Sequence, residues 1–455
     1  MGSCGNKVNE VFMLLTGKRV SSQTRHRVLF IFPYDWLTSP RSVREVQLLE
    51  NNNYQPIIVS TNIKYIIYDE SATFTSSPRF NMAFDKIPIY HLPFYVAPLI
   101  LPKLHFISKL LFGIFYFLSI TAYSFCLFIL TLTICLSKGI QVLHVHNLTD
   151  SPGVVAYLVS KITGIPYIYE VHDLTPEMFA ERMKLSPDSI IFKLLKEMEH
   201  IAISNSARNI FVSKAMQNHF LSSYSLPLSK SIVVYSSWSK NFSAIYRYSG
   251  NELDKLLKDF SLNDKFKIVY VGTMHEQRRG LITLIESMKI LVHDKKLTTI
   301  SLIFVGDGKL RRRLTQLTED YGLVKNVLFL GMLPRSEAYK WLTISNVAVN
   351  PLRKEAHMDI GVSNKLLEYM AAGKAVLVSD LTGHREVITS GYNGLLFDPD
   401  DPKDLAEKLS FLATNPETIR KYASNAGKDF MEKYCWERES IKILELYDEI
   451  LKEAI

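Results

Sequence analysis

The sequence predicts an α/β protein made of two doubly wound domains, each built on a parallel sheet. Apolar runs of strand length alternate with helical patterns, first from Arg27–Phe32 onward and again from Phe266–Val271 onward. Between these two series Ser236–Asp264 is polar and irregular, as is typical of a linker. We expect a tail (1–26), a first domain (27–240) with an apolar insert (94–138), a linker (241–263), a second domain (264–430) and a C-terminal helix (431–455).

The first domain opens with a βαβ unit: a strand, a helix and a strand at Arg27–Phe32, Ser42–Asn51 and Pro56–Ser60. Ligands of such sheets bind at the carboxyl ends of the strands, where the loop 34–41 lies. Arg41 and Arg44 could contact a phosphate there. A role as solvated residues at the start of a helix is equally compatible with their positions.

The run Leu110–Leu136 contains no charged residue. As one helix it would be about 40 Å long, more than the roughly 30 Å core of a bilayer. A single crossing is excluded, because the strands predicted before and after it, Arg27–Phe32 and Gln141–Val145, belong to one sheet. The run is therefore a re-entrant hairpin, an interfacial helix or a helix buried in the domain. Lysines flank both of its ends, which favours attachment to a membrane surface.

A strand–helix–strand pattern follows, at Gln141–Val145, Pro152–Thr163 and Pro166–Val171. His172 and Asp173 come directly after the last of these strands, so they lie at the edge where ligands bind. His144 and His146 alternate on one strand. Since a third metal ligand with suitable spacing is not evident, we interpret both as structural.

The second domain begins with a strand at Phe266–Val271, and the loop Gly272–Gly280 joins it to a helix. Arg279 stands at the start of that helix, where a positive charge opposes the helix dipole. This local conflict favours a bound anion beside Arg279. Further strands are predicted at Ser301–Val305 and Asn326–Leu330, and Asp401–Ile455 is predicted to be helical, with an apolar side that includes Ile441, Ile443 and Tyr447.

The stretch Asp359–Glu386 combines a helix N-terminus with a following strand. Ser363 is a candidate N-cap, Gly373 ends the helix and Ala375–Ser379 forms a short buried strand. A helix N-terminus suits a phosphate, and Glu368, one turn further in, lies at about the reach of a ribose beside a bound pyrophosphate. Alternatively, Glu368 is a solvated carboxylate paired with Lys365.

This stretch resembles the donor-binding signature of the glycosyltransferase family 4 enzymes, which have the two-domain GT-B fold. The matching string is Ser363–Val376, and the resemblance continues in Gly383–Glu386 and Gly391–Gly394. It is strongest in residues 142–177 and 266–397. It implies two Rossmann-like domains that face a cleft, and a C-terminal helix that crosses back to the first domain. The implied reaction moves a sugar from a nucleotide diphosphate-sugar donor to an acceptor with retention.

The resemblance also implies roles for single residues. Glu368 would hold the ribose, His172 would contact the transferred sugar, and Arg279 would grip the donor diphosphate. The implied catalytic residues are His172, Asp173, Arg279 and Glu368, and the implied donor-binding residues are Thr273, Arg278, Gly331, Met332, Leu333, Ser363, Asn364, Lys365 and Glu368. Two positions depart from the family pattern: Thr273 stands where an arginine is usual, and Ile360, beside Asp359, stands where an acid is usual.

Composition agrees with a globular enzyme, with 47% hydrophobic and 22% charged residues. The net charge of +8 suits a nucleotide-sugar donor or an anionic lipid surface, while no motif supports nucleic-acid binding. Residues 1–26 have no signal-peptide core, and the four cysteines have no metal-like spacing, as expected of a cytosolic protein.

We therefore expect a glycosyltransferase attached to the cytoplasmic face of the cell membrane. It would act on a sugar, glycolipid or lipid-linked acceptor, without a metal or other cofactor. The alternatives are a nucleotide-sugar epimerase of the same fold and a membrane-bound glycosyltransferase-like pseudoenzyme or scaffold.

Overall fold

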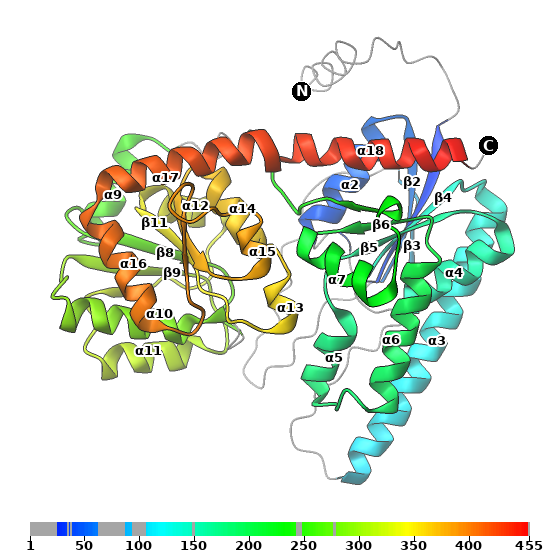
Figure 1. The fold of residues 1–455 in the computed structure, drawn as a ribbon, viewed down its shortest axis with the longest axis horizontal. Helices are drawn as coiled ribbons and strands as arrows, with labels where there is room; N and C mark the ends of the chain where they lie inside the picture. The colour runs from blue at the N-terminus through cyan, green and yellow to red at the C-terminus, as the bar shows by residue number, and fades with distance from the viewer. Residues whose placement is uncertain are drawn as a thin grey trace.

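The computed structural model describes residues 25–33, 36, 39–61, 87–92, 106–147, 151–242, 248–275 and 279–453. It contains a seven-stranded sheet and a six-stranded sheet, in which all neighbouring strands run parallel. Figure 1 shows the two sheets side by side along the long axis of the molecule, each covered by helices. The predicted fold class, α/β with two doubly wound parallel sheets, is confirmed.

The first sheet has the strand order β3-β2-β1-β4-β5-β6-β7. Its strands are β1 (His26–Phe32), β2 (Tyr54–Thr61), β3 (Ile89–Leu92), β4 (Val142–His146), β5 (Tyr167–Val171), β6 (Arg208–Phe211) and β7 (Ser231–Val233). Its helices are α2 (Pro40–Asn51), α3 (Phe106–Lys138), α4 (Ser151–Thr163), α5 (Thr175–Met183), α6 (Ile190–Ser204) and α7 (Lys214–Tyr224), with a short turn η2 (Leu228–Lys230). From β1 the chain first adds strands on one side of the sheet, β2 and β3, and then on the other side, from β4 onward. Open α/β sheets bind ligands at the carboxyl ends of the strands where this direction changes.

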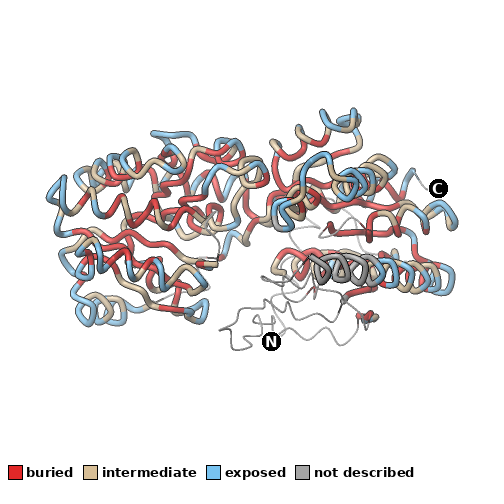
Figure 2. The backbone as a smooth tube through the Cα atoms, turned by 90° about the horizontal axis from the view of Figure 1, so that it is seen from below, coloured by how far each residue is buried: buried red, intermediate tan, exposed pale blue. Residues whose placement is uncertain are grey.

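Strand β1 shows why both faces of this sheet are apolar. Leu29 and Ile31 point into a core shared with α3, α4 and α7. Their neighbours Val28 and Phe30 point into a second core, shared with α2 and the C-terminal helix. A parallel sheet with helices on both faces requires such a continuous apolar strand. Figure 2 accordingly shows the buried backbone concentrated inside each half of the molecule.

The second sheet has the order β10-β9-β8-β11-β12-β13. Its strands are β8 (Phe266–Val271), β9 (Ile300–Val305), β10 (Val327–Phe329), β11 (Val347–Asn350), β12 (Ala375–Ser379) and β13 (Leu395–Phe397). Its helices are α10 (Leu281–Lys289), η4 (Ile290–Asp294), α11 (Arg311–Asp320), α12 (Arg335–Ile344), α13 (Ala356–Asp359), α14 (Asn364–Ala371), α15 (Thr382–Arg385), α16 (Pro402–Thr414), α17 (Pro416–Asp429) and η5 (Phe430–Tyr434). Alternate residues of β8 again face two cores, since Tyr270 packs toward α10 and α16 and Val269 toward α12 and α14.

The stretch expected to be an irregular linker contains a helix, α9 (Gly250–Asp259). A capping box starts it: the Ser249 hydroxyl accepts a hydrogen bond from the Glu252 N–H, and the Glu252 carboxylate accepts one from the Ser249 N–H. Leu256 and Leu257 pack against the second core cluster of the second domain. The prediction of an irregular linker was wrong for these residues, because it relied on their polar composition and overlooked the Ser-x-x-Glu pattern that starts a helix.

The C-terminal helix α18 (Trp436–Glu453) crosses from the second sheet to the first, as Figure 1 shows along the top of the molecule. Ile443, Tyr447 and Ile450 belong to the core that β1 and α2 form. The crossing implied by the family resemblance is therefore confirmed. Ile441, which the sequence pattern places on the apolar side, is 49% exposed.

The uncharged run lies within one continuous helix, α3, so the re-entrant hairpin is wrong. Tyr123, Leu127 and Ile134 of α3 are buried against the first sheet. Leu118, Phe125, Ile129 and Leu136 are exposed on another stripe of the helix. By length and composition alone, Ile120–Lys138 is the one helical stretch among the described residues that is long and apolar enough to span a bilayer.

The two isoleucines of α18 provide a matched test of the crossing. Ile443 is 1% exposed and Ile441 is 49% exposed. We expect Ile443→Ala to lower the unfolding free energy by about 2–5 kcal/mol, because it leaves a cavity in the core with β1. Ile441→Ala should change it by no more than about 0.5 kcal/mol. Urea unfolding of both variants checks this, and equal effects would contradict the packing of α18.

Candidate active site

Loops from three neighbouring strands of the second sheet converge at its carboxyl edge. A Cβ atom on Gly306 would lie 2.0 Å from the Gly272 carbonyl oxygen, so these loops after β9 and β8 touch through glycine alone. The Gly306 N–H donates to the Gly331 carbonyl at 2.8 Å, which ties in the loop after β10. A Cβ atom on Gly272 would lie 2.0 Å from Cε of Lys365. Lys365 on α14 therefore lies directly against the loop that leads to Arg279.

The predicted donor-binding residues of these loops differ in exposure. Thr273 is exposed, and its carbonyl accepts a hydrogen bond from the Tyr270 hydroxyl at 2.8 Å. Gly331 is buried, Leu333 is partly buried, and Met332 is exposed. The loop after β10 thus presents its backbone at the same edge of the sheet as the loop after β8.

Arg279 has a buried Nε atom without a hydrogen-bond partner in the described part of the chain. The next residue, Gly280, lies against the Pro351 carbonyl, since a Cβ atom there would meet that oxygen at 1.7 Å. Asn350, which precedes Pro351, likewise has a buried amide whose nitrogen and oxygen lack partners among the described residues. Buried polar atoms are rarely left unpaired, so this edge is suited to a polar ligand. Arg278 lies outside the described residues.

Helix α14 begins at Asn364, with Ser363 at the N-cap position. The predicted position of Ser363 is right, but its side chain forms no capping hydrogen bond. Asn364 is exposed, and the Lys365 ammonium lies 5.4 Å from the centroid of the Tyr270 ring. The N-terminus of this helix therefore opens beside the glycine loops, with a lysine next to it.

Glu368 is partly buried one turn inside α14, and its Oε1 accepts a hydrogen bond from the Tyr339 hydroxyl at 2.8 Å. Burial raises the pKa of Glu368 above its ordinary value, against the opposing effects of Arg335, Tyr339 and Lys365. The alternative of a solvated carboxylate paired with Lys365 does not describe this environment.

Asp359 precedes Ile360, the position at which the family pattern usually has an acid, and its carboxylate contacts Thr382. Its two carboxylate oxygens accept hydrogen bonds from the Thr382 N–H at 3.0 Å and the Thr382 hydroxyl at 2.7 Å. Ile360 itself packs against the core of the first domain. Asp359 therefore fixes the start of α15.

On the first domain, His172 and Asp173 directly follow β5, as predicted. The backbone N–H of His172 donates to Oδ1 of Asn147 at 2.7 Å, and the side-chain amide of Asn147 donates to the backbone carbonyl of Asp173 at 2.9 Å. The His172 ring is 21% exposed, and its Nε2 lies 3.0 Å from Oε1 of Glu170 and 2.9 Å from Nδ1 of His146. One ring nitrogen of His172 is thus held inside the domain.

Residues 265–415 match the sequence profile of a family described as glycosyl transferases group 1. An uncharacterized glycosyltransferase of Methanocaldococcus jannaschii is 28% identical over 317 residues, which cover 69% of this chain and 77% of the relative. The capsular polysaccharide biosynthesis glycosyltransferase CapM of Staphylococcus aureus is 25% identical over 325 residues, which cover 68% of this chain and 77% of CapM.

Solved structures share the fold. A glycosyltransferase from Rickettsia africae ESF-5 has a TM-score of 0.67 at 17% identity, covering 94% of this chain and 100% of that one. HepE of Anabaena in complex with UDP has a TM-score of 0.66 at 17% identity, covering 93% and 100%. The chain is a GT-B glycosyltransferase.

The first domain of this glycosyltransferase holds a buried charged cluster that sequence reasoning missed. Arg41 Nε lies 2.5 Å from Oε1 of Glu170 and 2.8 Å from Oε1 of Glu45. Arg41 is only 3% exposed and is paired with two carboxylates, so it is neither a solvated residue at the start of a helix nor free to contact a phosphate. His144 and His146, interpreted as structural, lie in the same cluster. The available signal was Glu170 itself, one acid within the otherwise apolar strand YIYEV.

Glu45, His144, His146 and Glu170 bring ligand atoms within 4.8 Å of one another, a set that a divalent metal ion accepts. However, Arg41 already places a cation within 2.8 Å of both carboxylates. A metal ion there would be repelled by the guanidinium. We therefore interpret the cluster as a hydrogen-bonded ion network of the glycosyltransferase.

The glycosyltransferase brings its two domains together around Trp238. The guanidinium carbons of Arg44 on α2 and Arg335 on α12 lie 4.9 Å and 4.5 Å from the centroid of its ring. Burial and the neighbouring Arg41 lower the pKa of Arg44 to about 9, while Glu368 of the second domain acts in the opposite direction. Arg44 therefore reaches from the first domain toward the candidate donor site.

Glu386 forms a second contact between the domains. Its carboxylate accepts hydrogen bonds from the backbone N–H groups of Lys214 and Ala215, at the start of α7, and from the Tyr235 hydroxyl at 2.9 Å. A carboxylate at a helix N-terminus is stabilised by the helix dipole. This contact fixes the second domain against the first.

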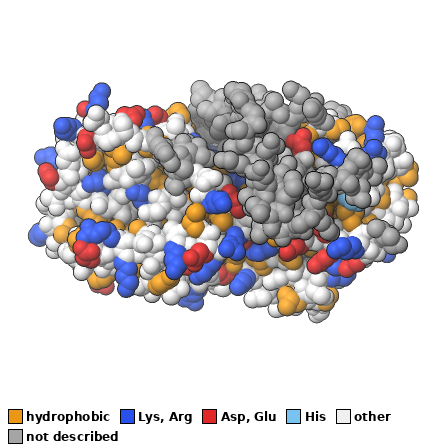
Figure 3. Space-filling view, turned by 90° about the horizontal axis from the view of Figure 1, so that it is seen from above, with side chains coloured by type: hydrophobic (Ala, Val, Ile, Leu, Met, Phe, Trp, Pro, Cys, Tyr) orange, Lys and Arg blue, Asp and Glu red, His pale blue; other side chains and the backbone are white. Residues whose placement is uncertain are grey.

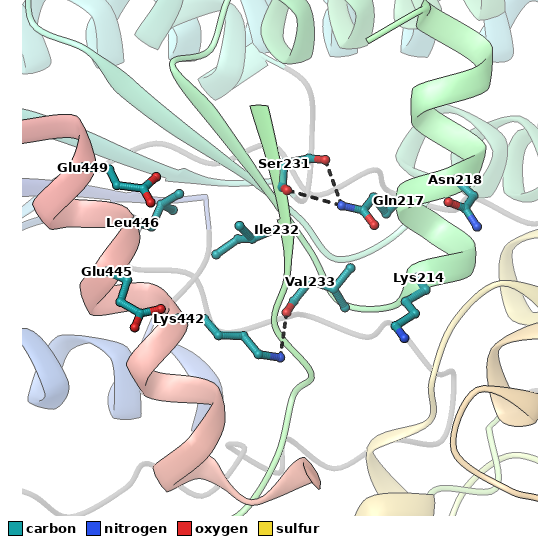
Figure 4. A pocket seen from close by; sticks show the side chains of 10 residues that line it. All are labelled: Lys214, Gln217, Asn218, Ser231, Ile232, Val233, Lys442, Glu445, Leu446 and Glu449. Atoms are coloured by element: carbon teal, nitrogen blue, oxygen red, sulfur yellow. Dashed lines mark hydrogen bonds between the residues drawn. The ribbon is translucent and has the colours of Figure 1, made fainter. Parts of the chain in front are cut away.

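A pocket of about 400 Å³ lies elsewhere, between β7, α7 and α18 (Figure 4). Gln217 donates to the Ser231 hydroxyl at 2.8 Å, and Lys442 donates to the Val233 carbonyl at 3.1 Å. None of the candidate site residues lines this pocket. Figure 3 shows basic and acidic side chains interspersed on the described part of another face, so the net charge forms no single basic surface there.

Glu45 provides a test of the buried cluster by pH. Burial and Glu170 raise the pKa of Glu45 to about 7, while Arg41 lowers it. Because the folded pKa exceeds the unfolded value, the stability this carboxyl contributes is present at low pH and is lost as the pH rises to about 7. We expect Glu45→Gln to gain on the order of 3 kcal/mol relative to wild type between about pH 4.5 and pH 7. Urea unfolding across this range measures the difference.

The matched control for this experiment is Glu407→Gln, which changes an exposed acid on α16. Its unfolding free energy should follow that of the wild type at every pH. A Glu45→Gln curve parallel to the wild-type curve would show that Glu45 titrates normally in the folded protein.

Proposed function

We propose that this glycosyltransferase is a retaining enzyme of the family 4 type, which moves a sugar from a nucleotide diphosphate-sugar donor to a glycan or lipid-linked acceptor. One observation carries the proposal. Arg279, Lys365 and the uncapped N-terminus of α14 gather around the loop after β8. Two cations and a helix N-terminus at one sheet edge suit a diphosphate.

The chemistry of the step fits these groups. As the bond between sugar and diphosphate breaks, negative charge grows on the leaving group, and fixed cations stabilise it. Arg279 and Lys365 supply that charge, so the proposal requires no metal or other cofactor. Ser363 and Asn364 would bind the phosphates at the start of α14, with Thr273 across from them.

The remaining donor contacts follow from the same placement. Glu368 would accept hydrogen bonds from the ribose hydroxyls, beside the Tyr339 hydroxyl that orients it. The backbone of Gly331, Met332 and Leu333 would seat the base. His172 and Asp173, at the carboxyl edge of the first sheet, would contact the transferred sugar from the other domain.

Relatives support the substrate class. HepE of Anabaena binds UDP in its crystal structure, and CapM of Staphylococcus aureus acts in capsular polysaccharide biosynthesis. We infer a nucleoside diphosphate donor and a place in the synthesis of a polysaccharide, glycolipid or cell-surface glycan. An epimerase would instead isomerise the nucleotide sugar without any acceptor, and a pseudoenzyme would turn over none.

Three substitutions separate the proposed donor roles. Arg279→Ala should weaken UDP or GDP binding and slow single turnover, because its charge acts on the diphosphate in both states. Glu368→Gln should weaken nucleotide binding about ten- to hundredfold through loss of a charge-assisted hydrogen bond. His172→Ala should bind nucleotide like wild type and turn over more slowly. Calorimetry and single-turnover rates with a matching nucleotide sugar measure these effects.

The matched control for Arg279→Ala is Arg420→Ala, which removes an exposed positive charge on α17. The matched control for Glu368→Gln is Glu407→Gln, which removes an exposed negative charge on α16. Both should bind nucleotide like the wild type. Failure of the wild type to bind any nucleoside diphosphate would refute the enzymatic proposal. Wild-type affinity in Glu368→Gln would refute only the role assigned to that residue.

We also propose that α3 attaches the enzyme peripherally to the cytoplasmic face of the cell membrane. Its outer stripe, Leu118, Phe125, Ile129 and Leu136, consists of large apolar side chains that are exposed. Helix α4 packs against α3 and adds exposed Leu158 and Ile162. Since the opposite stripe of α3 is part of the core, the helix would lie in the interface and not cross the bilayer.

The double substitution Phe125→Ser with Leu136→Ser tests this attachment. Both side chains are exposed, so the fold should persist, while each lost apolar side chain removes favourable burial in the lipid interface. We expect the variant to cosediment less with anionic phospholipid vesicles than the wild type does. Val324→Ser, an equally exposed apolar residue of the second domain, is the control and should bind unchanged. Equal binding by the double variant would rule out α3 as the anchor.

A further inference from the structure

The partners of the His172 ring restrict which of its nitrogens carries a proton. Nε2 lies 3.0 Å from Oε1 of Glu170 and 2.9 Å from Nδ1 of His146. An ionised carboxylate at 3.0 Å repels the lone pair of a ring nitrogen and attracts its proton, so Glu170 favours a proton on Nε2 of His172. His146 Nδ1 then accepts from the same N–H. In its neutral form His172 therefore has no proton on Nδ1.

The neighbouring histidines also place Nε2 beside a carboxylate. His146 Nε2 lies 3.2 Å from Oε2 of Glu45, a close contact that is not a hydrogen bond. His144 Nε2 lies 3.1 Å from Oε2 of Glu170, to which it donates, and its Nδ1 accepts from the Tyr447 hydroxyl at 2.7 Å. In all three rings Nε2 thus lies within 3.2 Å of a carboxylate oxygen, which favours a proton on that nitrogen.

The charges in the cluster agree with this arrangement. Burial opposes ionisation of Glu170, but Arg41 and the hydrogen bond from His144 hold its pKa well below the ordinary value, so it is a carboxylate. Burial lowers the pKa of His146 to about 3, so that ring is neutral and carries one proton. The described titratable groups around His172 include an anion from β5, Glu170, a neutral ring from β4, His146, and Glu45 of α2, which interacts with His172 electrostatically.

We propose that Glu170 is a positioning residue that fixes the tautomer of His172, so that Nδ1 serves as a hydrogen-bond acceptor for a hydroxyl of the transferred sugar. This inference rests on the proposed function, in which His172 contacts that sugar. Glu170 is the last residue but one of β5 and is fully buried, so it would not touch the substrate itself. Its effect on catalysis passes through the His172 ring.

The tautomer can be read directly in the full-length wild type. Long-range ¹⁵N–¹H correlation of ¹⁵N-histidine-labelled protein at pH 8 distinguishes a protonated from an unprotonated ring nitrogen, and the spectrum of His172→Asn assigns the signals. We expect His172 to be protonated at Nε2 and unprotonated at Nδ1. The opposite tautomer would overturn the proposal. Because this readout needs no activity, it holds even if the proposed function fails.

Kinetics then test the consequence. In Glu170→Gln the amide N–H₂ can donate to Nε2 and so favours the other tautomer. We expect kcat to fall about ten- to hundredfold with the UDP dissociation constant unchanged, as for loss of a charge-assisted hydrogen bond. The control is Tyr447→Phe, which removes a hydroxyl from the His144 side of the cluster, and should keep the tautomer and turnover of the wild type. A folded Glu170→Gln with wild-type turnover would refute the proposal.

Two substitutions of His172 provide a test that does not disturb the buried charge. Asparagine places its amide oxygen near the position of Nδ1, whereas glutamine places its amide near Nε2. We expect His172→Asn to retain more turnover than His172→Gln, since only the former leaves an acceptor where the sugar hydroxyl would bind. The reverse order would show that Nε2, not Nδ1, acts on the sugar.

Discussion

The carboxylate of Glu170 contacts three elements of the first domain at once: Arg41 on α2, His144 on β4 and His172 after β5. An isolated charge inside a protein is too costly to keep, so these partners must remain in place for the fold to persist. The network extends through His144 to Tyr447, which brings α18 into it. The carboxyl edge of the first sheet is therefore built around one buried negative charge.

Helix α2 connects this network to the second domain. Arg41, on one turn, neutralises Glu170, while Arg44, almost one turn later, contacts Trp238 and lies near Glu368. The candidate ribose ligand and the candidate sugar contact are thus supported by neighbouring residues of a single helix. A rigid helix holds such groups in place more accurately than a loop does.

Helix α3 resolves what composition left open. A helix that is apolar on every side usually spans a membrane or lies inside a large core. Here one stripe, with Tyr123 and Leu127, completes the core of the first domain, and the opposite stripe, with Phe125 and Ile129, remains exposed. One stripe of this apolar helix is therefore part of the core, and the other lies on the surface of the protein.

The sequence by itself determined the α/β class, the position of most strands and the loop residues at their ends, because these follow from local periodicity and turn chemistry, but it did not predict β3, β11 or β13. Strand Ala375–Ser379 and the glycine after α14 lie where the pattern places them. Only the tertiary structure decided which charges meet. Arg41 and Glu170 are 129 positions apart in the chain, and no local pattern predicts that the first is an internal counterion of the second. The structural role of Asp359 likewise depends on Thr382, with which it forms a hydrogen bond, and not on Ile360, the next residue in the sequence. Long-range pairing of buried charges depends on how strands are ordered in the sheet, and periodicity carries no information about that order.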